Sequence, residues 1–214
     1  SRFAAFKEFE AFSQVMKETG KGVWQITKGV SPTIEELEQL AESASRPMQI
    51  CPMLQDPGQP EVVFNDMASI SAAQNRGREL YGQVSPFPEI LEFNLREPYP
   101  MESIQAWRPA MAAQTDEEKI SVYRDHNFRN SVKEELKTTG GPFRFSNQWN
   151  TMTIVSTKNS SLLGRTVAEI ATNLNSHPLD CMLDLALSEF LETNFTVGMF
   201  NAEEDAVTRL LTHE

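Results

Sequence analysis

Residues 22–84 alternate three short apolar segments with two amphipathic ones, and this order constrains the fold more than any other feature. The apolar segments are GVWQIT (22–27), PMQIC (47–51) and LYGQV (80–84). Strands that are apolar along most of their length, rather than at alternate positions, are typical of parallel sheets that helices cover. The order strand, helix, strand, helix, strand therefore predicts an α/β fold.

The amphipathic segments carry helix signals. In the first, Ser31 can cap the helix and Pro32 fits the first helical position. A helix before the first strand is expected to end at Gly20, which suits a left-handed terminus. The apolar stripes at helical spacing are Phe3, Phe6, Phe9, Phe12, Val15 and Met16, then Ile34, Leu37, Leu40, Ala41 and Ala44, then Val63, Met67, Ile70 and Ala73.

From about residue 86 to 165 this rhythm stops, and the segment is rich in proline. A helix is expected around Phe128, Val132 and Leu136, and a short strand over 151–155. A connection this long is uncommon inside a compact domain and is often a lid or binding loop, although it could be mere decoration. We therefore expect one domain over 1–214 with an insertion over about 86–165.

Three helices are expected after the insertion. Thr166 and Glu169 form a capping box for the first, and Pro178 opens the second. Asn201 with Glu204 is expected to cap the third. The apolar stripes of the last two are Leu179, Met182, Leu183, Ala186 and Phe190, then Val207, Leu210 and Leu211.

Composition excludes several function classes. The formal net charge of -11 disfavours nucleic acid and anionic membrane surfaces as partners. No apolar stretch approaches the roughly 20 residues that a membrane span needs, so we expect a soluble, cytoplasmic protein. Cys51 and Cys181 lie far apart without a CxxC companion, which predicts two free thiols rather than a disulfide framework or zinc knuckle.

The chemistry-bearing residues do not form a known signature. No P-loop, GxGxxG, GxSxG or HExxH motif occurs. His126, His177 and His213 occupy expected capping or surface positions, so we expect no metal site in this chain and name no catalytic residue.

Three residues of the apolar strands are candidates for contacting a substrate. Cys51, at a strand end, could act as a thiolate ligand or nucleophile, or be an inert buried thiol. Gln25 and Gln83 are amides that must find partners if buried. They could line a substrate pocket or brace the strands.

The segments LLGRTVAEIA, HPLDCMLDLAL and NFTVGMFNAEEDAVTRLLTHE resemble the N-acyl-D-amino-acid deacylase (D-aminoacylase-like) branch of the amidohydrolase superfamily. Weaker matches are TGKGVWQI, SRPMQICPML, ELYGQVSPFP and YRDHNFRNSV. The resemblance implies a metal-dependent (β/α)8 barrel that hydrolyses amide bonds of N-acyl (D-)amino acids with a metal-activated water. It also implies zinc or another divalent metal in a full-length protein. Where this family places histidine in a strand, the chain has Cys51 and Pro52.

A closed barrel of this kind has eight strands and about 250 residues. We therefore expect a partial TIM-barrel-like fragment with a long helical insertion, inactive as an isolated chain. Its open sheet is expected to leave a strand edge and an apolar face uncovered, which favours a homodimer. The alternative function is a non-catalytic α/β scaffold or interaction module.

Overall fold

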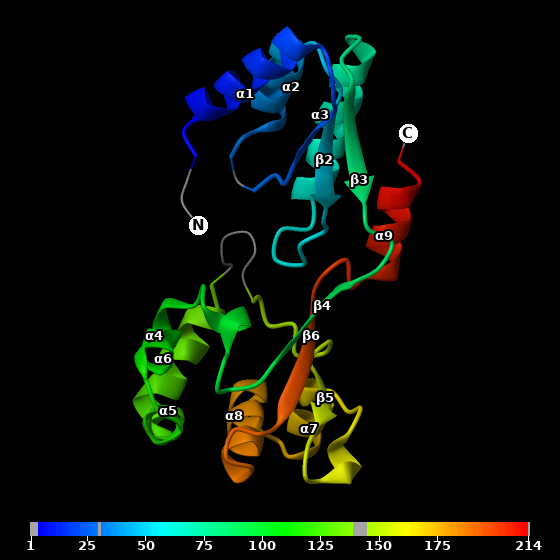
Figure 1. Cartoon of the computed structure of the whole chain (residues 1–214). Helices are drawn as coiled ribbons and strands as arrows, with labels where there is room; N and C mark the ends of the chain where they lie inside the picture. Colours follow the sequence, from blue (N-terminus) through cyan, green and yellow to red (C-terminus); the bar gives the residue numbers. More distant parts are fainter. Residues whose placement is uncertain (1–3, 30, 139–144, 214) are drawn as a thin grey trace. The chain divides into compact units, whose positions relative to one another are not determined.

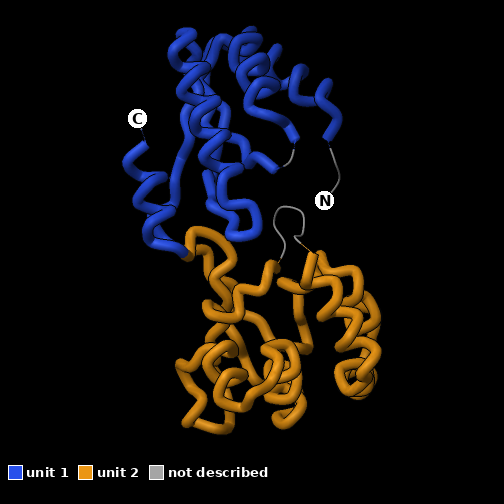
Figure 2. The backbone as a smooth tube through the Cα atoms, turned by 180° about the vertical axis from the view of Figure 1, so that it is seen from behind, with its two compact units in different colours: residues 1–87, 203–214 blue, residues 88–202 orange. Residues whose placement is uncertain are grey.

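The computed structural model describes residues 4–29, 31–138 and 145–213. The chain divides into two compact units, residues 1–87 with 203–214 and residues 88–202 (Figures 1 and 2). Within the described residues, no helix combines the length and apolarity that a membrane crossing requires.

The first unit contains a three-stranded parallel sheet in the order β1-β2-β3. Its helices and strands follow one another as the sequence predicts, which confirms the α/β class and the parallel pairing. They are α1 (Phe6–Thr19), β1 (Trp24–Ile26), α2 (Ile34–Ala44), β2 (Met48–Met53), α3 (Val62–Asn75), β3 (Leu80–Val84) and α9 (Glu204–Leu211).

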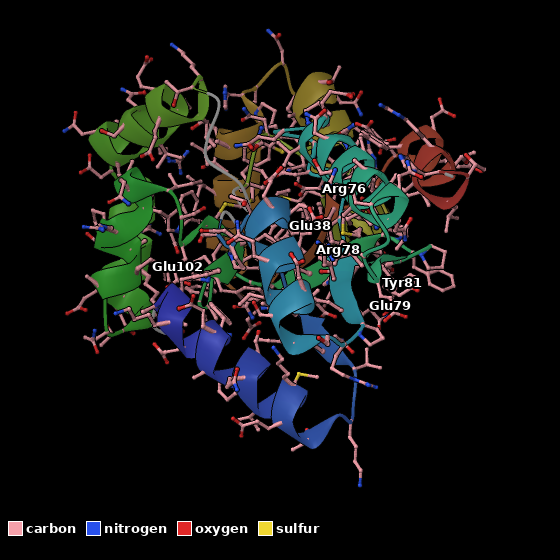
Figure 3. The ribbon with its side chains drawn as sticks, turned by 90° about the horizontal axis from the view of Figure 1, so that it is seen from above. Glu38, Arg76, Arg78, Glu79, Tyr81 and Glu102 are labelled. Atoms are coloured by element: carbon pink, nitrogen blue, oxygen red, sulfur yellow. The ribbon has the colours of Figure 1, made fainter. Side chains whose placement is uncertain are left out.

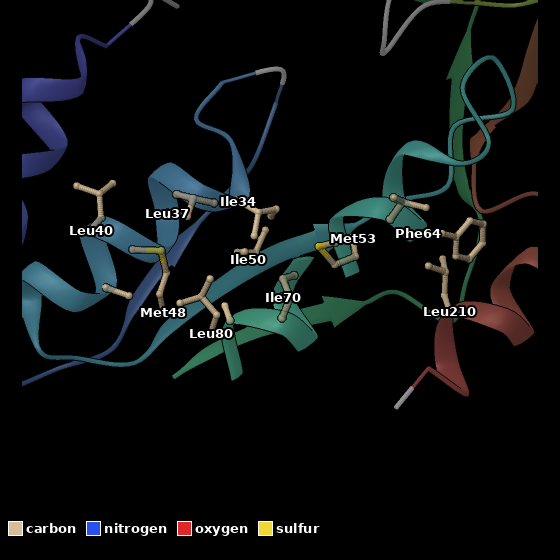
Figure 4. Packing of buried hydrophobic residues seen from close by; sticks show 13 residues of the cluster. Ile34, Leu37, Leu40, Met48, Ile50, Met53, Phe64, Ile70, Leu80 and Leu210 are labelled. Atoms are coloured by element: carbon tan, nitrogen blue, oxygen red, sulfur yellow. The ribbon is translucent and has the colours of Figure 1, made fainter. Parts of the chain in front are cut away.

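The core of this unit lies between the sheet and its helices (Figure 4). Leu37 of α2, Ile50 of β2 and Leu80 of β3 are buried there, and Leu210 of α9 joins the same cluster. On α9, the Arg209 guanidinium lies 3.5 Å from the centroid of the Phe64 ring. The helix α1 is associated with α2, since the Ser13 hydroxyl donates to the Leu40 carbonyl. The cluster contains Ile34, Leu37, Leu40, Ala41, Met48, Ile50, Met53, Val63, Phe64, Ile70, Ala73, Leu80 and Leu210.

The helix ends confirm one sequence prediction and correct two. Gly20 ends α1 with a φ of 61°, as expected. The cap of α2 is Thr33, whose hydroxyl accepts from Glu36 N, because the helix begins two residues later than Pro32. Asn201 does not cap α9, which follows Glu203 without a side-chain cap. Leu211 is exposed rather than inward, because α9 presents its apolar side through Val207 and Leu210.

The second unit is built around an antiparallel sheet in the order β4-β6-β5. The strand expected over 151–155 and the helix around Phe128 are confirmed, while β4 and β6 are not predicted from the sequence. The elements are β4 (Glu89–Phe93), the 3-10 turns Tyr99–Met101, Gln105–Trp107 and Ser160–Leu162, α4 (Arg108–Ala112), α5 (Asp116–Arg124), α6 (His126–Leu136), β5 (Thr153–Ser156), α7 (Val167–Asn173), α8 (Pro178–Ser188) and β6 (Asn194–Phe200).

A charged side chain connects two helices of the second unit. Arg129 of α6 is buried and donates to Tyr123 O at 2.7 Å and to the Asp184 carboxylate of α8 at 2.7 Å.

Thr166 and Glu169 form the expected capping box of α7. Phe190, expected on the inner face of the next helix, is 67% exposed because α8 ends at Ser188 and Phe190 adopts a left-handed φ of 54°.

The described residues form two separate three-stranded sheets and no closed barrel. A single barrel domain with an insertion over about 86–165 stays a prediction. The unit boundary at residue 88 lies near the expected start of that insertion, whereas the second unit continues to residue 202.

Candidate functional site

One face of the parallel sheet carries polar side chains from all three strands. The register pairs Gln25 of β1 with Gln49 of β2, and Gln49 with Tyr81 of β3. Cys51 and Gln83 lie two residues further along β2 and β3. Because successive side chains of a strand point to opposite faces, these five residues share one face. The structure thus brings the three predicted residues Gln25, Cys51 and Gln83 onto the same surface.

This face is open, whereas the opposite face is covered by helices. Gln25, Tyr81 and Gln83 are exposed, and Gln49 and Cys51 are half-buried. On the helix side, Met48 and Leu80 are fully buried. The expectation that the uncovered face is apolar is therefore wrong for this sheet, because strand alternation directs the apolar residues to the helices.

A hydrogen bond connects two of the amides across neighbouring strands. Gln49 Nε2 donates to Gln83 Oε1 at 2.5 Å. The sequence interpretation missed Gln49, although the signal was present: it is a polar residue within PMQIC, two positions before Cys51. Gln83 is thus hydrogen-bonded to the neighbouring strand on the open face. A role of Gln25 and Gln83 in lining a substrate pocket stays a prediction.

The carboxyl ends of β1 and β2 carry further polar groups. Lys28 follows β1 and forms an ion pair of 2.8 Å with Asp66 of α3, with side chains only 12% and 22% exposed. Gln55, which follows β2, is buried, and Asp56 Oδ1 accepts from Gly58 N at 2.8 Å. These contacts hold the loops that follow the carboxyl ends of β1 and β2.

Arginine and glutamate side chains near the start of β3 form a cluster of ion pairs (Figure 3). Glu38 of α2 accepts from Arg76 at 2.5 Å, and Arg78 lies 2.6 Å from Glu42. The hydrogen bond from Arg76 lowers the pKa of the Glu38 carboxyl, and the positive charges of Arg76 and Arg78 act in the same direction. This cluster joins α2 to the segment after α3 and lies near the amino end of β3, so its role is structural.

The histidines do not converge with Cys51. His126 begins α6, His213 follows α9, and His177 caps α8 by accepting from Leu179 N at 3.1 Å. Burial, with a smaller effect of the Lys133 charge, lowers the pKa of His177. In the part of the chain that the structure describes, no group of three or more His, Cys, Asp or Glu side chains could hold a metal ion. The donor set of these residues therefore does not fit the divalent metal that the family resemblance implies.

Comparison with known proteins gives no matching family model and no matching curated protein. Solved structures do match. The chain resembles D-aminoacylase-like amidohydrolases. N-acyl-D-glutamate deacylase from Bordetella bronchiseptica, in complex with zinc and a phosphonate inhibitor, matches 98% of the chain with a TM-score of 0.45 and 16% identity. A D-aminoacylase structure with a binuclear metal centre matches 97% with a TM-score of 0.42 and 14% identity. The chain spans about a third of the length of these proteins, 34% in each case.

Proposed function

We propose that this chain is part of a hydrolase that cleaves the C–N amide bond of N-acyl (D-)amino acids. The observation that supports the proposal is the two-sided character of the parallel sheet. Helices cover its apolar face, and the opposite face presents Gln25, Gln49, Cys51, Tyr81 and Gln83. Strands of a (β/α)8 barrel have one face toward the surrounding helices and one toward the barrel interior. In the proposal, β1 to β3 are three strands of such a partial barrel.

The amide side chains on this face would bind and orient a substrate. A carboxamide offers one acceptor and two donors and does not titrate, so it can hold a polar group but cannot serve as a proton carrier. Gln49 and Gln83 are held by their mutual hydrogen bond, which pre-orients both. The groups that carry out hydrolysis, including zinc or another divalent metal, are assigned by the proposal to a longer protein. No step through a metal follows from the residues described.

The test compares this chain with the product of a longer gene model. Both are incubated with a mixture of N-acetyl-D-amino acids, and the released amine is measured. We expect hydrolysis by the longer product and none by the isolated chain. In the longer product, Gln49→Leu should lower kcat/KM by about tenfold through loss of hydrogen bonds to the substrate. A longer product that binds a metal yet hydrolyses none of these substrates would contradict the proposal.

The second candidate is a non-catalytic interaction module in which two copies associate. Its support is that β1 and β3 are the edge strands of the first unit's sheet, and edge strands present backbone groups that a further strand can pair with. Because the exposed face is polar, burying it in a dimer would contribute little hydrophobic stabilisation. Backbone hydrogen bonds at the edge strands would therefore have to hold the two copies together. Light scattering after size-exclusion chromatography tests this pairing, and a strict monomer across the micromolar range would contradict it.

A further inference from the structure

A cavity of about 600 Å³ lies along α7 in the second unit. Two of the side chains that line it are charged, the guanidinium of Arg165 and the carboxylate of Glu169. The polar and charged lining residues are Asn150, Arg165, Thr166, Glu169, Thr172 and Asn173. One positive and one negative group therefore face the same enclosed space.

The backbone holds both charged residues in place. Ile154 N of β5 donates to Arg165 O at 3.0 Å, which ties the residue before α7 to the neighbouring strand. The Glu169 carboxylate accepts from Thr166 N at 3.1 Å as part of the capping box. That bond uses the oxygen Oε2, so the second oxygen of Glu169 stays available to a ligand.

The Arg165 side chain differs from the other arginines of comparable burial. Among the described residues, each remaining buried or half-buried arginine donates a side-chain hydrogen bond to a protein oxygen, namely Arg46, Arg78, Arg96 and Arg129. Arg165 is also half-buried, yet its guanidinium has no hydrogen bond or ion pair with any residue that the structure describes. Charged side chains rarely leave water without a partner. Glu169 lines the same cavity but lies beyond ion-pair distance of Arg165.

We propose that this cavity binds a free α-amino acid as its zwitterion, with the carboxylate on Arg165 and the ammonium group on Glu169. A guanidinium presents parallel N–H donors that match the two oxygens of a carboxylate. An ammonium group has three donors and no acceptor, which suits the second oxygen of Glu169 and the side-chain oxygens of Asn150 and Asn173. A ligand with only one of these charges leaves the opposite charge of the cavity unmatched.

The ligand class has a meaning for the reaction, and that link alone rests on the proposed function. Hydrolysis of an N-acyl amino acid releases a free amino acid, whose nitrogen becomes an ammonium group. The N-acyl substrate has an uncharged amide at that position. The cavity would therefore distinguish the product from the substrate.

The inference is tested by NMR on the ¹⁵N-labelled chain at pH 6.5 and constant ionic strength. The signals followed are the Arg165 Nε–H and the side-chain NH2 groups of Asn150 and Asn173. The probes are D-alanine, N-acetyl-D-alanine, acetate and ethylammonium. We expect D-alanine to shift these signals to saturation. The other three should bind at least about tenfold more weakly, because each lacks one charge-assisted contact.

Variants assign the binding to the two charges. Arg165→Gln and Glu169→Gln should each weaken D-alanine binding by about tenfold. Glutamine also suits the third position of a capping box, so Glu169→Gln should keep the backbone spectrum of α7. Only Arg165→Gln should also abolish the weak binding of acetate. The matched control is Arg124→Gln, which removes an exposed arginine of α5 outside the cavity and should leave D-alanine binding intact.

Three results would each overturn the inference: equal affinity for D-alanine and acetate, no saturable shift at Arg165, or D-alanine binding that survives Glu169→Gln. The readout is binding to the chain itself, so it does not depend on hydrolysis. An inactive longer protein would refute the proposed function and leave this titration unchanged. Hydrolysis by a longer protein whose cavity ignores D-alanine would refute the inference alone.

Discussion

Replacing Arg129 by methionine should destabilise the second unit by about 2–3 kcal/mol, based on hydrogen bonds to charged groups. The Arg129 side chain is 11% exposed and donates to Tyr123 O, Asp180 and Asp184. Methionine keeps most of the apolar volume and removes every donor. Breaking a buried ion pair costs about 3–5 kcal/mol, but here the carboxylate of Asp184 is 64% exposed and water can replace its partner. The expected loss of stability is therefore about 2–3 kcal/mol rather than about 3–5 kcal/mol.

The assay is urea unfolding followed by tryptophan fluorescence in a Trp24→Phe background. In that background, Trp107 and Trp149 report the second unit. The control Asp184→Asn removes the exposed carboxylate and should cost less than about 1 kcal/mol, as exposed ion pairs do. A loss below about 1 kcal/mol for Arg129→Met, or one equal to that of the control, would refute a stabilising role of the buried guanidinium.

Three further predictions concern titration, thiols and metal. The neutral ring of His177 accepts a hydrogen bond from Leu179 N, and burial lowers the pKa of His177. The stability that this neutral ring contributes is therefore complete above the ordinary pKa of histidine and is lost as the pH falls below that value. The urea midpoint should decline from pH 7.5 to 5, and His177→Asn, which keeps a cap acceptor, should flatten that decline. Half-buried Cys51 should react with a thiol reagent. Cys181 should not react, because burial raises the pKa of its thiol to about 11. Rapid labelling of two thiols per chain would contradict this prediction. Elemental analysis of the isolated chain should find no stoichiometric zinc, and one tightly held zinc per chain would show that its residues form a site after all.

The first unit is predictable because its signals are local. Each strand from Trp24 to Val84 is short, directs apolar residues toward the helices, and is followed or preceded by a helix, so the predicted order of elements agrees with the structure. The misplaced cap at Ser31 is a two-residue error at a helix boundary, where Thr33 offers the same hydroxyl chemistry. By contrast, β4 and β6 pair residues about 100 positions apart, such as Phe93 with Phe195, and no local pattern encodes that partnership.

The candidate site was partly accessible from the sequence for a related reason. A polar residue within an apolar strand marks the face that helices do not cover, which identifies Gln25 and Gln83. The importance of Gln49 depends on cross-strand register, since its amide meets that of Gln83 only when β2 and β3 are aligned as observed. Spacing within one strand cannot supply that alignment.

The passage of the chain from β3 through residues 88–202 and back to α9 sets an order of assembly. A growing polypeptide emerges from the ribosome in sequence order, so β1 to β3 appear before α9 is made. During that interval the Phe64 ring lacks the Arg209 guanidinium, and the apolar cluster lacks Leu210. The second unit, which is continuous in sequence, acquires all of its parts first. The unit whose strands are synthesised earliest is therefore the last to be completed.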